Sequence, residues 1–284
     1  MAGTLYLCAT PIGNLSDMTP RVIQTLTDVD LIAAEDTRNS IKLLNHFEIK
    51  TPMTSYHEYN KVEKAEVLIA KLKQGQEIAL ITDAGTPAIS DPGEVLVRMA
   101  LQEGITVTSL PGPAACITAL TLSGLSTRRF CFEGFLPADK KEKKQVLADL
   151  QNEKRTIILY EAPHHLKRTL AELYETLGQR KITLCRELTK KFESVMPTTL
   201  EDAIAYYEQN EPRGEYVLVV EGKNIQEMIA EEIASWEQMT IEDHMAFYEK
   251  DGMPQKEAMK RVAKDRGVTK RDIYQYLIRK GVDK

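Results

Sequence analysis

The sequence has few cysteines, and their spacing matches neither a disulfide framework nor a zinc site. Four occur in 284 residues, Cys8, Cys116, Cys131 and Cys185, and no two of them form a C-x-x-C pair. Each lies next to an apolar residue. We therefore expect buried, reduced thiols, which are typical of a cytoplasmic protein, and we expect no metal site.

Long hydrophobic runs and a strong excess of either charge are also missing. No apolar run approaches the roughly 18 residues that can span a bilayer, and residues 1–13 lack the basic start of a signal peptide. The 42 acidic and 37 basic side chains leave a net charge of only −5. This balance argues against a surface built throughout for nucleic acid. We expect a cytoplasmic protein with no membrane partner, in which any contact with nucleic acid is local.

The composition, with 43% hydrophobic and 28% charged residues, is typical of a folded protein. The length of 284 residues suits two domains. Over the first 110 residues, short apolar or β-branched runs alternate with segments of helical periodicity. The expected strands are 4–9, 30–34, 52–56, 77–82 and 105–110, and the expected helices are 21–27, 41–47, 62–72 and 95–101. This alternation predicts a mostly parallel sheet in a domain that we place at residues 1–112.

A second α/β domain is expected over residues 113–222, where the order of strands and helices changes. The expected strands are 130–135, 156–161, 182–187 and 216–221, and the expected helices are 143–150, 166–177 and 200–209. This order suits a mixed sheet. The predicted fold class is therefore α/β, with two α/β domains followed by a helical extension.

Residues 223–284 contain no strand pattern and split sharply in charge. Residues 227–253 carry eight acids and one base, whereas residues 254–284 carry ten bases and four acids. Two helical patterns, at 255–266 and from Thr269 onward, are joined at Gly267 in a way that resembles a helix-turn-helix. A helical hairpin used only for packing or dimerisation fits the spacing equally well. The basic side chains that favour contact with phosphates are Lys256, Lys260, Arg261, Lys264, Lys270, Arg271, Arg279 and Lys280.

Glycine, proline and acidic residues gather directly after the expected strands of the first domain. The loops are 10–14, 35–38, 57–60, 83–93 and 111–113. Ligands of open α/β sheets bind beyond the carboxyl ends of the strands, and small residues and prolines let the backbone approach a ligand closely. Because the chain has no G-x-x-x-x-G-K-[ST] motif and the first loop has one glycine, we expect a flat nucleoside rather than a triphosphate. Any one loop also fits an ordinary tight turn, but their clustering favours a binding site.

Eight longer strings resemble one family closely. They are ATPIGNL (9–15), AEDTR (34–38), SYHE (55–58), TDAGTPAISDPG (82–93), PGPAA (111–115), FEGFLP (132–137), YEAPH (160–164) and RELTK (186–190). On these strings the chain resembles the small-subunit ribosomal RNA methyltransferase I family, the cytidine 2′-O-methyltransferases of the tetrapyrrole methylase superfamily. The resemblance implies S-adenosylmethionine in a cleft between the two α/β domains, no metal, 16S ribosomal RNA of the small subunit as partner, and a homodimer.

The resemblance also implies which residues line that cleft. From the loops of the first domain and the turn that follows it, they are Pro11, Gly13, Asp83, Gly85, Thr86, Pro87, Ile89, Ser90, Pro111, Gly112, Ala114 and Ala115. From the second domain they are Tyr160, Glu161, Ala162, Leu188, Glu215 and Tyr216. Tetrapyrrole methylases tend to have Gly-Asp-Pro where this chain has Gly-Thr-Pro, with Asp83 just upstream, so it stays open which acid meets the ligand.

Methyl transfer from a sulfonium needs alignment above all, and alignment alone contributes on the order of 7–11 kcal/mol. A neutral ribose hydroxyl is a poor nucleophile, so a general base would add about 10²–10⁴-fold. The candidates for catalysis are Glu35, Asp36, Arg38 and His57. We favour Glu35, whereas helix capping with an ion pair to Arg38 suits Asp36 at least as well. A lone loop histidine such as His57 is more often structural or exposed.

Two other functions are compatible with the sequence. The same fold and cofactor would serve the methylation of a corrin or porphyrin precursor, and a non-catalytic protein would bind nucleic acid through its tail. The basic tail argues for RNA over a small molecule, and the glycine and proline loops argue against a vestigial cleft. The function that the resemblance implies, S-adenosylmethionine-dependent 2′-O-methylation of a cytidine ribose in 16S ribosomal RNA, is therefore the one we expect.

Overall fold

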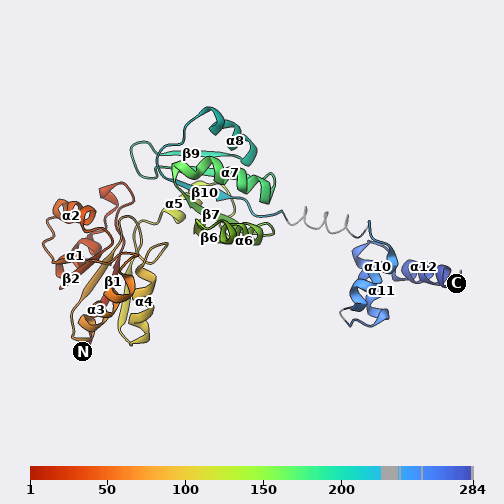
Figure 1. Ribbon diagram of the computed structural model, residues 1–284, viewed down its shortest axis with the longest axis horizontal. Coiled ribbons are helices and arrows are strands. Elements are labelled where there is room, and N and C mark those ends of the chain that lie inside the picture. The colour runs from red at the N-terminus through yellow and green to blue at the C-terminus, as the bar shows by residue number, and fades with distance from the viewer. Residues whose placement is uncertain (225–235, 237, 251, 283–284) are drawn as a thin grey trace. The chain divides into compact units, whose positions relative to one another are not determined.

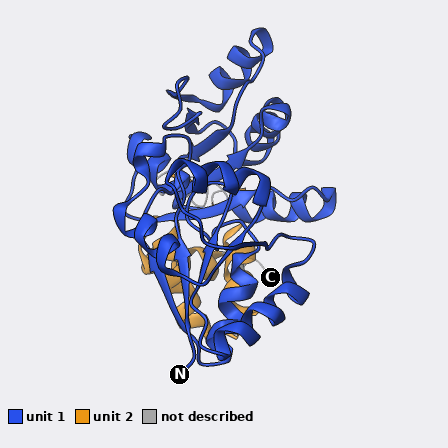
Figure 2. Cartoon of the chain, turned by 90° about the vertical axis from the view of Figure 1, so that its left-hand side faces the viewer, with its two compact units in different colours: residues 1–222 blue, residues 223–284 orange. Residues whose placement is uncertain are grey.

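The computed structural model describes residues 1–224, 236, 238–250 and 252–282 of the chain. The chain divides into two compact units, Met1–Gly222 and Lys223–Lys284, which are coloured separately in Figure 2. The first unit contains two five-stranded sheets. We call the part that carries the first sheet the first lobe and the part that carries the second sheet the second lobe.

The first lobe contains a parallel sheet. Its strands are β1 (Thr4–Cys8), β2 (Leu31–Ala34), β3 (Met53–Ser55), β4 (Ile78–Ile81) and β5 (Thr106–Leu110), in the order β3-β2-β4-β1-β5. Every strand pair in it is parallel, as the alternating sequence pattern predicts. Because all the strands run the same way, the loops that follow them meet at one edge of the sheet.

Helices cover both faces of this sheet (Figure 1). They are α1 (Pro20–Asp28), α2 (Thr37–His46), α3 (Lys61–Lys73) and α4 (Gly93–Gln102), and a 3-10 turn, η1 (Leu15–Asp17), precedes α1. One core cluster packs Leu68 of α3 and Leu96 of α4 against the sheet, and another packs Leu26 of α1 and Leu44 of α2. Strand β4, with the sequence IALI, is buried along its whole length because both of its faces are covered.

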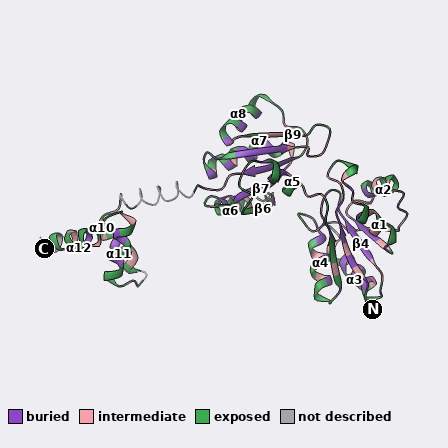
Figure 3. Cartoon of the chain, turned by 180° about the vertical axis from the view of Figure 1, so that it is seen from behind, coloured by how far each residue is buried: buried purple, intermediate pink, exposed green. Residues whose placement is uncertain are grey.

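The second lobe contains a mixed sheet. Its strands are β6 (Phe130–Phe135), β7 (Thr156–Glu161), β8 (Lys181–Arg186), β9 (Ser194–Thr199) and β10 (Tyr216–Val220), in the order β6-β7-β10-β8-β9. Only β6 and β7 pair in parallel. Helices α6 (Lys140–Leu150), α7 (Pro163–Leu177) and α8 (Leu200–Gln209) share one core cluster with this sheet, and α5 (Ala115–Leu122) shares another. The central strands of this lobe are buried (Figure 3).

Strand β9 is a strand that the sequence did not predict. It forms an edge of the second sheet, and none of its six residues is buried, so it lacks the apolar run of a central strand. Pro197 lies within it, and proline is confined to such edges because it cannot donate a ladder hydrogen bond. The other strands of the two sheets lie within one residue of the predicted bounds, and the predicted α/β fold class is confirmed.

The described part of the second unit contains the helices α10 (Ile241–Lys250), α11 (Gln255–Asp265) and α12 (Lys270–Val282). The predicted capping box starts α12: the Thr269 N–H donates to Asp272 Oδ2 over 2.9 Å, and the Asp272 N–H donates to Thr269 Oγ1 over 3.3 Å. The three helices share one apolar core, whose buried residues are Met245, Ala258, Met259, Val262, Ala263 and Ile273.

The cysteines agree with the expectation of buried, reduced thiols. All four cysteines are free and buried. Among the described residues, no helix is both long and apolar enough to cross a membrane.

Candidate functional site

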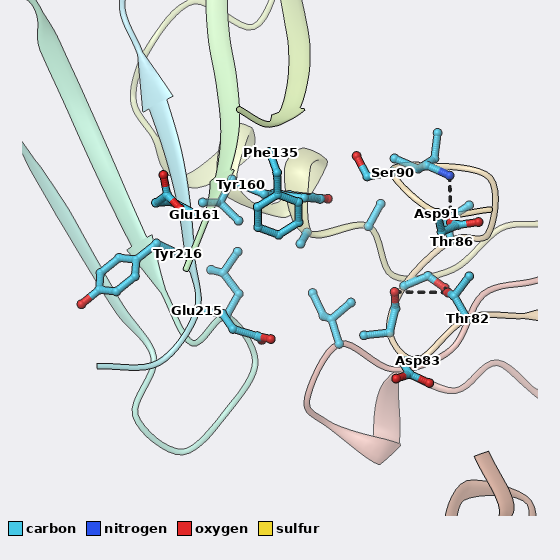
Figure 4. Close-up of a pocket in the computed structure, with 18 of the residues that line it drawn as sticks. Thr82, Asp83, Thr86, Ser90, Asp91, Phe135, Tyr160, Glu161, Glu215 and Tyr216 are labelled. Carbon is cyan, nitrogen blue, oxygen red and sulfur yellow. Dashed lines mark hydrogen bonds between the residues drawn. The ribbon is translucent and has the colours of Figure 1, made fainter. Parts of the chain in front are cut away.

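A cavity of about 410 Å³ lies where loops of the two lobes face each other (Figure 4). Its volume falls within the roughly 300–1,000 Å³ that small-molecule sites occupy. The loops after β1, β2 and β4 of the first lobe contribute, as does the segment that leads from β5 into α5. The second lobe contributes the ends of β6 and β7, the loop after β8 and the start of β10. The lining residues are Ile12, Glu35, Thr82, Asp83, Ala84, Gly85, Thr86, Ile89, Ser90, Asp91, Ala114, Ala115, Phe135, Tyr160, Glu161, Ala162, Cys185, Glu187, Leu188, Lys190, Glu215, Tyr216 and Val217.

Hydrogen bonds hold the first-lobe loops together at the cavity. The backbones of Thr10 and Gly85 form an isolated antiparallel bridge, with N–O distances of 2.9 and 3.0 Å. The Thr86 hydroxyl donates to the Pro113 carbonyl over 2.9 Å and so joins the loop after β4 to the turn after β5. Gly85 has a φ of 85°, which glycine adopts without strain. These loops therefore form one preformed wall.

Asp91 shapes the loop between β4 and α4. Its carboxylate accepts hydrogen bonds from the N–H groups of Ala88 (2.9 Å), Ile89 (3.0 Å) and Gly93 (2.8 Å). Ala88 and Ser90 have left-handed φ angles of 67° and 62°, which cost a non-glycine residue about 1–2 kcal/mol. The three hydrogen bonds offset this strain and hold Ile89 and Ser90 at the cavity.

Aromatic side chains form part of the second-lobe wall. The Tyr160 ring packs edge to face against Phe132 and Phe135, with centroid distances of 4.9 and 5.5 Å. Its hydroxyl accepts a hydrogen bond from the Cys116 N–H over 3.2 Å. Burial raises the pKa of Tyr160 above its ordinary value, because a buried phenolate would lose its hydration. Phe135 is 58% exposed and presents an apolar ring to the cavity.

A lysine between two glutamates lies at the same wall. Lys190 Nζ donates to Glu187 Oε1 over 2.9 Å and to Glu215 Oε2 over 2.7 Å. Glu187 Oε1 also accepts from the Glu215 N–H over 2.9 Å. Burial opposes the charge on Lys190, but the hydrogen bonds to Glu215 and Glu187 outweigh burial and raise its pKa. The cluster ties the loop after β8 to the start of β10.

Two glycines allow the lobes to approach each other closely. Gly13 lies against Lys190, and a Cβ at Gly13 would come within 2.3 Å of Lys190 Cγ. Gly134 lies beside an irregularity in β6 and has a φ of 62°. A Cβ at Gly134 would come within 2.6 Å of Ser90 Oγ. A side chain at either position would therefore have to displace its neighbour on the opposite wall, Lys190 or Ser90.

Glu35 and Asp83 bring two carboxylates to the first-lobe wall. The Asp83 N–H donates to Glu35 Oε2 over 3.3 Å, and the Asp36 N–H donates to Asp83 Oδ1 over 3.2 Å. Burial is the main cause that raises the pKa of Glu35. The hydrogen bond from the Asp83 N–H lowers this pKa, and the negative charges of Asp83, Asp91 and Asp36 raise it further.

The cavity as a whole is lined mainly by acids. Six lining side chains are carboxylic acids and one is a lysine, so the cavity suits a ligand with positive charge.

Three other candidates for catalysis do not line the cavity. Asp36 is the N-cap of α2: its carboxylate accepts from the Arg38 N–H over 2.8 Å and pairs with the Arg38 guanidinium over 2.7 Å. These hydrogen bonds lower the pKa of Asp36 to about 2. The His57 ring lies beside Asn60, with Nε2 3.3 Å from Asn60 Nδ2, and the backbone N–H of His57 donates to Asn60 Oδ1 over 2.8 Å. The geometry around Asp36 matches the capping interpretation that the sequence also allowed.

The comparisons with known proteins identify the family. The family of Tetrapyrrole (Corrin/Porphyrin) Methylases matches residues 4–204. A protein of Halalkalibacterium halodurans named ribosomal RNA small subunit methyltransferase I is 50% identical over 96% of this chain and 93% of its own length. A protein of the same name from Bacillus subtilis is 49% identical over the same shares of the two chains. The chain belongs to the ribosomal RNA small-subunit methyltransferase I family.

A solved structure has a similar fold. Uroporphyrin-III C-methyltransferase from Thermus thermophilus superposes with a TM-score of 0.55 at 18% identity, over 76% of this chain and 94% of the other. At that identity the likeness concerns the fold alone. Membership in the methyltransferase I family makes the chain an S-adenosylmethionine-dependent methyltransferase of the tetrapyrrole methylase superfamily.

Most residues that the resemblance to the methyltransferase I family singled out lie at the cavity. They are Asp83, Gly85, Thr86, Ile89, Ser90, Ala114, Ala115, Tyr160, Glu161, Ala162, Leu188, Glu215 and Tyr216. Glu35, predicted as a candidate for catalysis, lines the cavity as well. Five others lie in the same loops without lining it: Pro11, Gly13, Pro87, Pro111 and Gly112. Two of these five have a packing role, because Gly13 meets the second lobe and a Cβ at Gly112 would come within 2.6 Å of Ala9 Cβ.

Several lining residues were not predicted. Asp91, Glu187 and Lys190 lie inside the strings that carry the family resemblance, so their place in those strings was an available signal. Cys185 and Val217 are buried strand residues that nothing in the sequence distinguishes from ordinary core. The remaining ones are Ile12, Thr82, Ala84 and Phe135.

Proposed function

We propose that this chain transfers the methyl group of S-adenosylmethionine to the ribose 2′-oxygen of a cytidine in 16S ribosomal RNA. The RNA substrate is supported by the names of the relatives, and the 2′-oxygen of cytidine by the family resemblance of the eight strings. The observation that carries the proposal is the acid-lined cavity formed by loops of both lobes. We further propose residues 1–112 and 113–222 as the two domains that hold the cofactor, in a homodimer.

The cavity fits the cofactor in size, shape and charge. Adenine is a flat apolar ring, which suits the side chains of Ile12, Ile89 and Leu188. A sulfonium and an ammonium carry positive charge, which suits a wall in which acids outnumber bases. Asp83 and Glu215 are acids of this wall from opposite lobes, and we assign them to the positive groups. When bound, the cofactor supplies a methyl group that already has a good leaving group.

We assign proton removal from the ribose hydroxyl to Glu35. Its carboxylate lines the cavity, and burial raises its pKa, which makes it a stronger base than an exposed glutamate once it is ionised. The N–H of Asp83 holds one of its oxygens, and the other oxygen is left for a hydroxyl donor. Removal of the hydroxyl proton by Glu35 raises the electron density on the attacking oxygen.

The walls of the cavity position the cofactor and the ribose oxygen relative to each other. The bridge between Thr10 and Gly85 and the Asp91 hydrogen bonds preform the first-lobe wall, so little order has to be gained on binding. The Lys190 cluster performs the same task in the second lobe. Fixed walls on both sides restrict the approach of the oxygen to one direction, which is how alignment lowers a barrier.

The experiment that tests the proposal is transfer of tritium from methyl-labelled S-adenosylmethionine. The acceptors are small ribosomal subunits from cells that lack the protein, naked 16S RNA, and uroporphyrinogen III as a tetrapyrrole. We expect label in RNA from the wild-type protein and a loss of about 10²-fold with Glu35→Gln. Label in the tetrapyrrole and none in either RNA sample would contradict the proposal and select the corrin or porphyrin alternative.

A further inference from the structure

We propose that helix α11 holds the RNA substrate by its phosphate backbone, along one row of basic side chains. The inference rests on the proposed RNA substrate and names the surface that binds it. It makes α11 the main contact, whereas a DNA-binding helix-turn-helix reads base edges with its second helix, which here is α12.

Helix α11 has one apolar face and one basic face. The apolar face is buried in the core of the second unit, where Met259 and Val262 contribute to the shared cluster. The basic row on the other face consists of the exposed residues Lys256, Lys260, Arg261 and Lys264. The three lysines repeat every four residues, so they lie along one side of the helix over about 12 Å. A straight row of this kind can follow a chain of phosphates.

The basic row has no acidic partner among the described residues. None of the ion pairs found there includes any of its four side chains. A hollow of about 410 Å³ runs beside the row, lined by Met253, Glu257, Lys260, Arg261 and Lys264. Unpaired cations around a hollow leave room and charge for an anion from outside the chain.

Arg266, in the same unit, differs from the basic row because its side chain is hydrogen-bonded within the unit. Arg266 is committed internally: its Nε donates to His244 Nδ1 over 3.1 Å, and its guanidinium also donates to the Thr240 carbonyl over 3.1 Å. The charge of Arg266 therefore stabilises the unit itself. Helix α10 carries the acids Glu242, Asp243 and Glu249, so positive charge within this unit is concentrated away from it, on α11 and α12.

The geometry of RNA favours the side of α11 over the tip of α12. The major groove of an A-form duplex is deep and narrow, so a helix cannot enter it as α12 would have to do in a helix-turn-helix on DNA. Contact with phosphates needs no groove and no particular base sequence. A row of lysines on the side of a helix provides that contact on folded ribosomal RNA.

The test compares two variants of the full chain with the same loss of charge. Lys256→Gln/Lys260→Gln/Lys264→Gln removes the row on α11, and Lys140→Gln/Lys141→Gln/Lys144→Gln removes three exposed lysines on α6. Affinity for 16S RNA is measured without cofactor between 50 and 300 mM KCl, roughly the range in which counterion release dominates. We expect the α11 variant to lower the slope of log Kd against log salt by about 2–3 and to weaken binding roughly 10- to 100-fold at 100 mM. We expect the α6 variant to match the wild type.

The possible results distinguish a failure of the proposed RNA-binding surface on α11 from a failure of the proposed methyl transfer. A rise in KM for RNA at unchanged kcat in the α11 variant supports the proposal, as does its altered salt slope. An unchanged slope, an equal change in the α6 variant, or a larger loss with Arg271→Gln/Tyr274→Ala on α12 would overturn it. Because binding is measured without methyl transfer, RNA bound along α11 by a protein that methylates no RNA would contradict only the proposed function.

Discussion

Glu35 is the single side chain on which the proposed chemistry depends most. Glu35→Gln keeps the size of the side chain and removes the base, so we expect kcat to fall by about 10²-fold with cofactor affinity nearly unchanged. Because burial raises the pKa of Glu35, the wild-type kcat/KM should fall on the acidic side at a pH above the roughly 4.3 of an exposed glutamate. A pH profile of both proteins checks this, and a variant with full activity would remove Glu35 from the mechanism.

The thermal stability of Glu35→Gln is the control for its loss of activity. A carboxyl whose pKa is raised by folding favours the folded state below its unfolded pKa and loses that contribution as the pH rises through its folded pKa. Glutamine has no such dependence. We therefore expect Glu35→Gln to melt at or above the wild-type temperature at pH 7, with a difference that shrinks towards pH 4. A lower melting temperature at pH 7 would mean that lost activity reflects lost structure.

Gly134 tests whether the close approach of the two lobes matters for the site. Gly134→Ala places a side chain on left-handed backbone and against Ser90, whereas Gly104→Ala places one on similar backbone, at a φ of 69°, in open space. Both should lower the free energy of unfolding by about 1–2 kcal/mol. Only Gly134→Ala should also weaken S-adenosylmethionine binding, by roughly tenfold as it displaces Ser90. Equal cofactor affinities in calorimetry would contradict a role for this contact.

At the scale of the element, the loop between β4 and α4 depends on Asp91. Asp91→Ala removes three hydrogen bonds and leaves the strain at Ala88 and Ser90 uncompensated. We expect a loss of about 3 kcal/mol in urea unfolding and a cofactor affinity 10- to 100-fold lower. Asp91→Asn keeps one acceptor oxygen and should fall between the wild type and Asp91→Ala. Wild-type values for Asp91→Ala would show that the loop is held by other contacts.

The elements of this chain differ in how far the sequence predicts them. Central strands such as β4 and β7 are buried on both faces, so an apolar run is sufficient to find them. Apolar periodicity finds the middle of a helix but misses its polar first turn: α2 begins at Thr37 and α6 at Lys140, each after a capping aspartate. The edge strand β9 has no buried residue and so gives no apolar signal.

The sequence predicts which loops form the site but not all of the contacts between them. The loops after the parallel strands were predictable because strand direction brings them to one edge of the sheet. The contact of Gly134 with Ser90 joins the two lobes, and the hydrogen bond of Lys190 to Glu215 joins two loops of the second lobe. Both pairs link residues far apart in the sequence and depend on tertiary packing, which no local pattern of residues encodes.

At the scale of the whole molecule, the cavity and the basic row belong to different units. Every lining residue of the cavity lies within Met1–Gly222, and the core of the second unit is separate from the four clusters of the first. A chain that ends at Gly222 should therefore fold and bind S-adenosylmethionine within about twofold of the full chain, while its KM for 16S RNA rises at least about tenfold. Calorimetry and steady-state kinetics check both values. Loss of cofactor binding on truncation would contradict the independence of the units.

The central claim is that the cavity between the two lobes directs a methyl group from S-adenosylmethionine to a ribose oxygen of cytidine in 16S RNA. The most direct measurement is mass spectrometry of nucleosides, after small subunits from cells lacking the protein have been treated with the purified wild-type or Glu35→Gln chain and the cofactor. The account predicts a new 2′-O-methylcytidine with the wild-type chain and about 10²-fold less with the variant at equal times. A methyl group found on a base, on another nucleoside, or in equal amount with both proteins would contradict it.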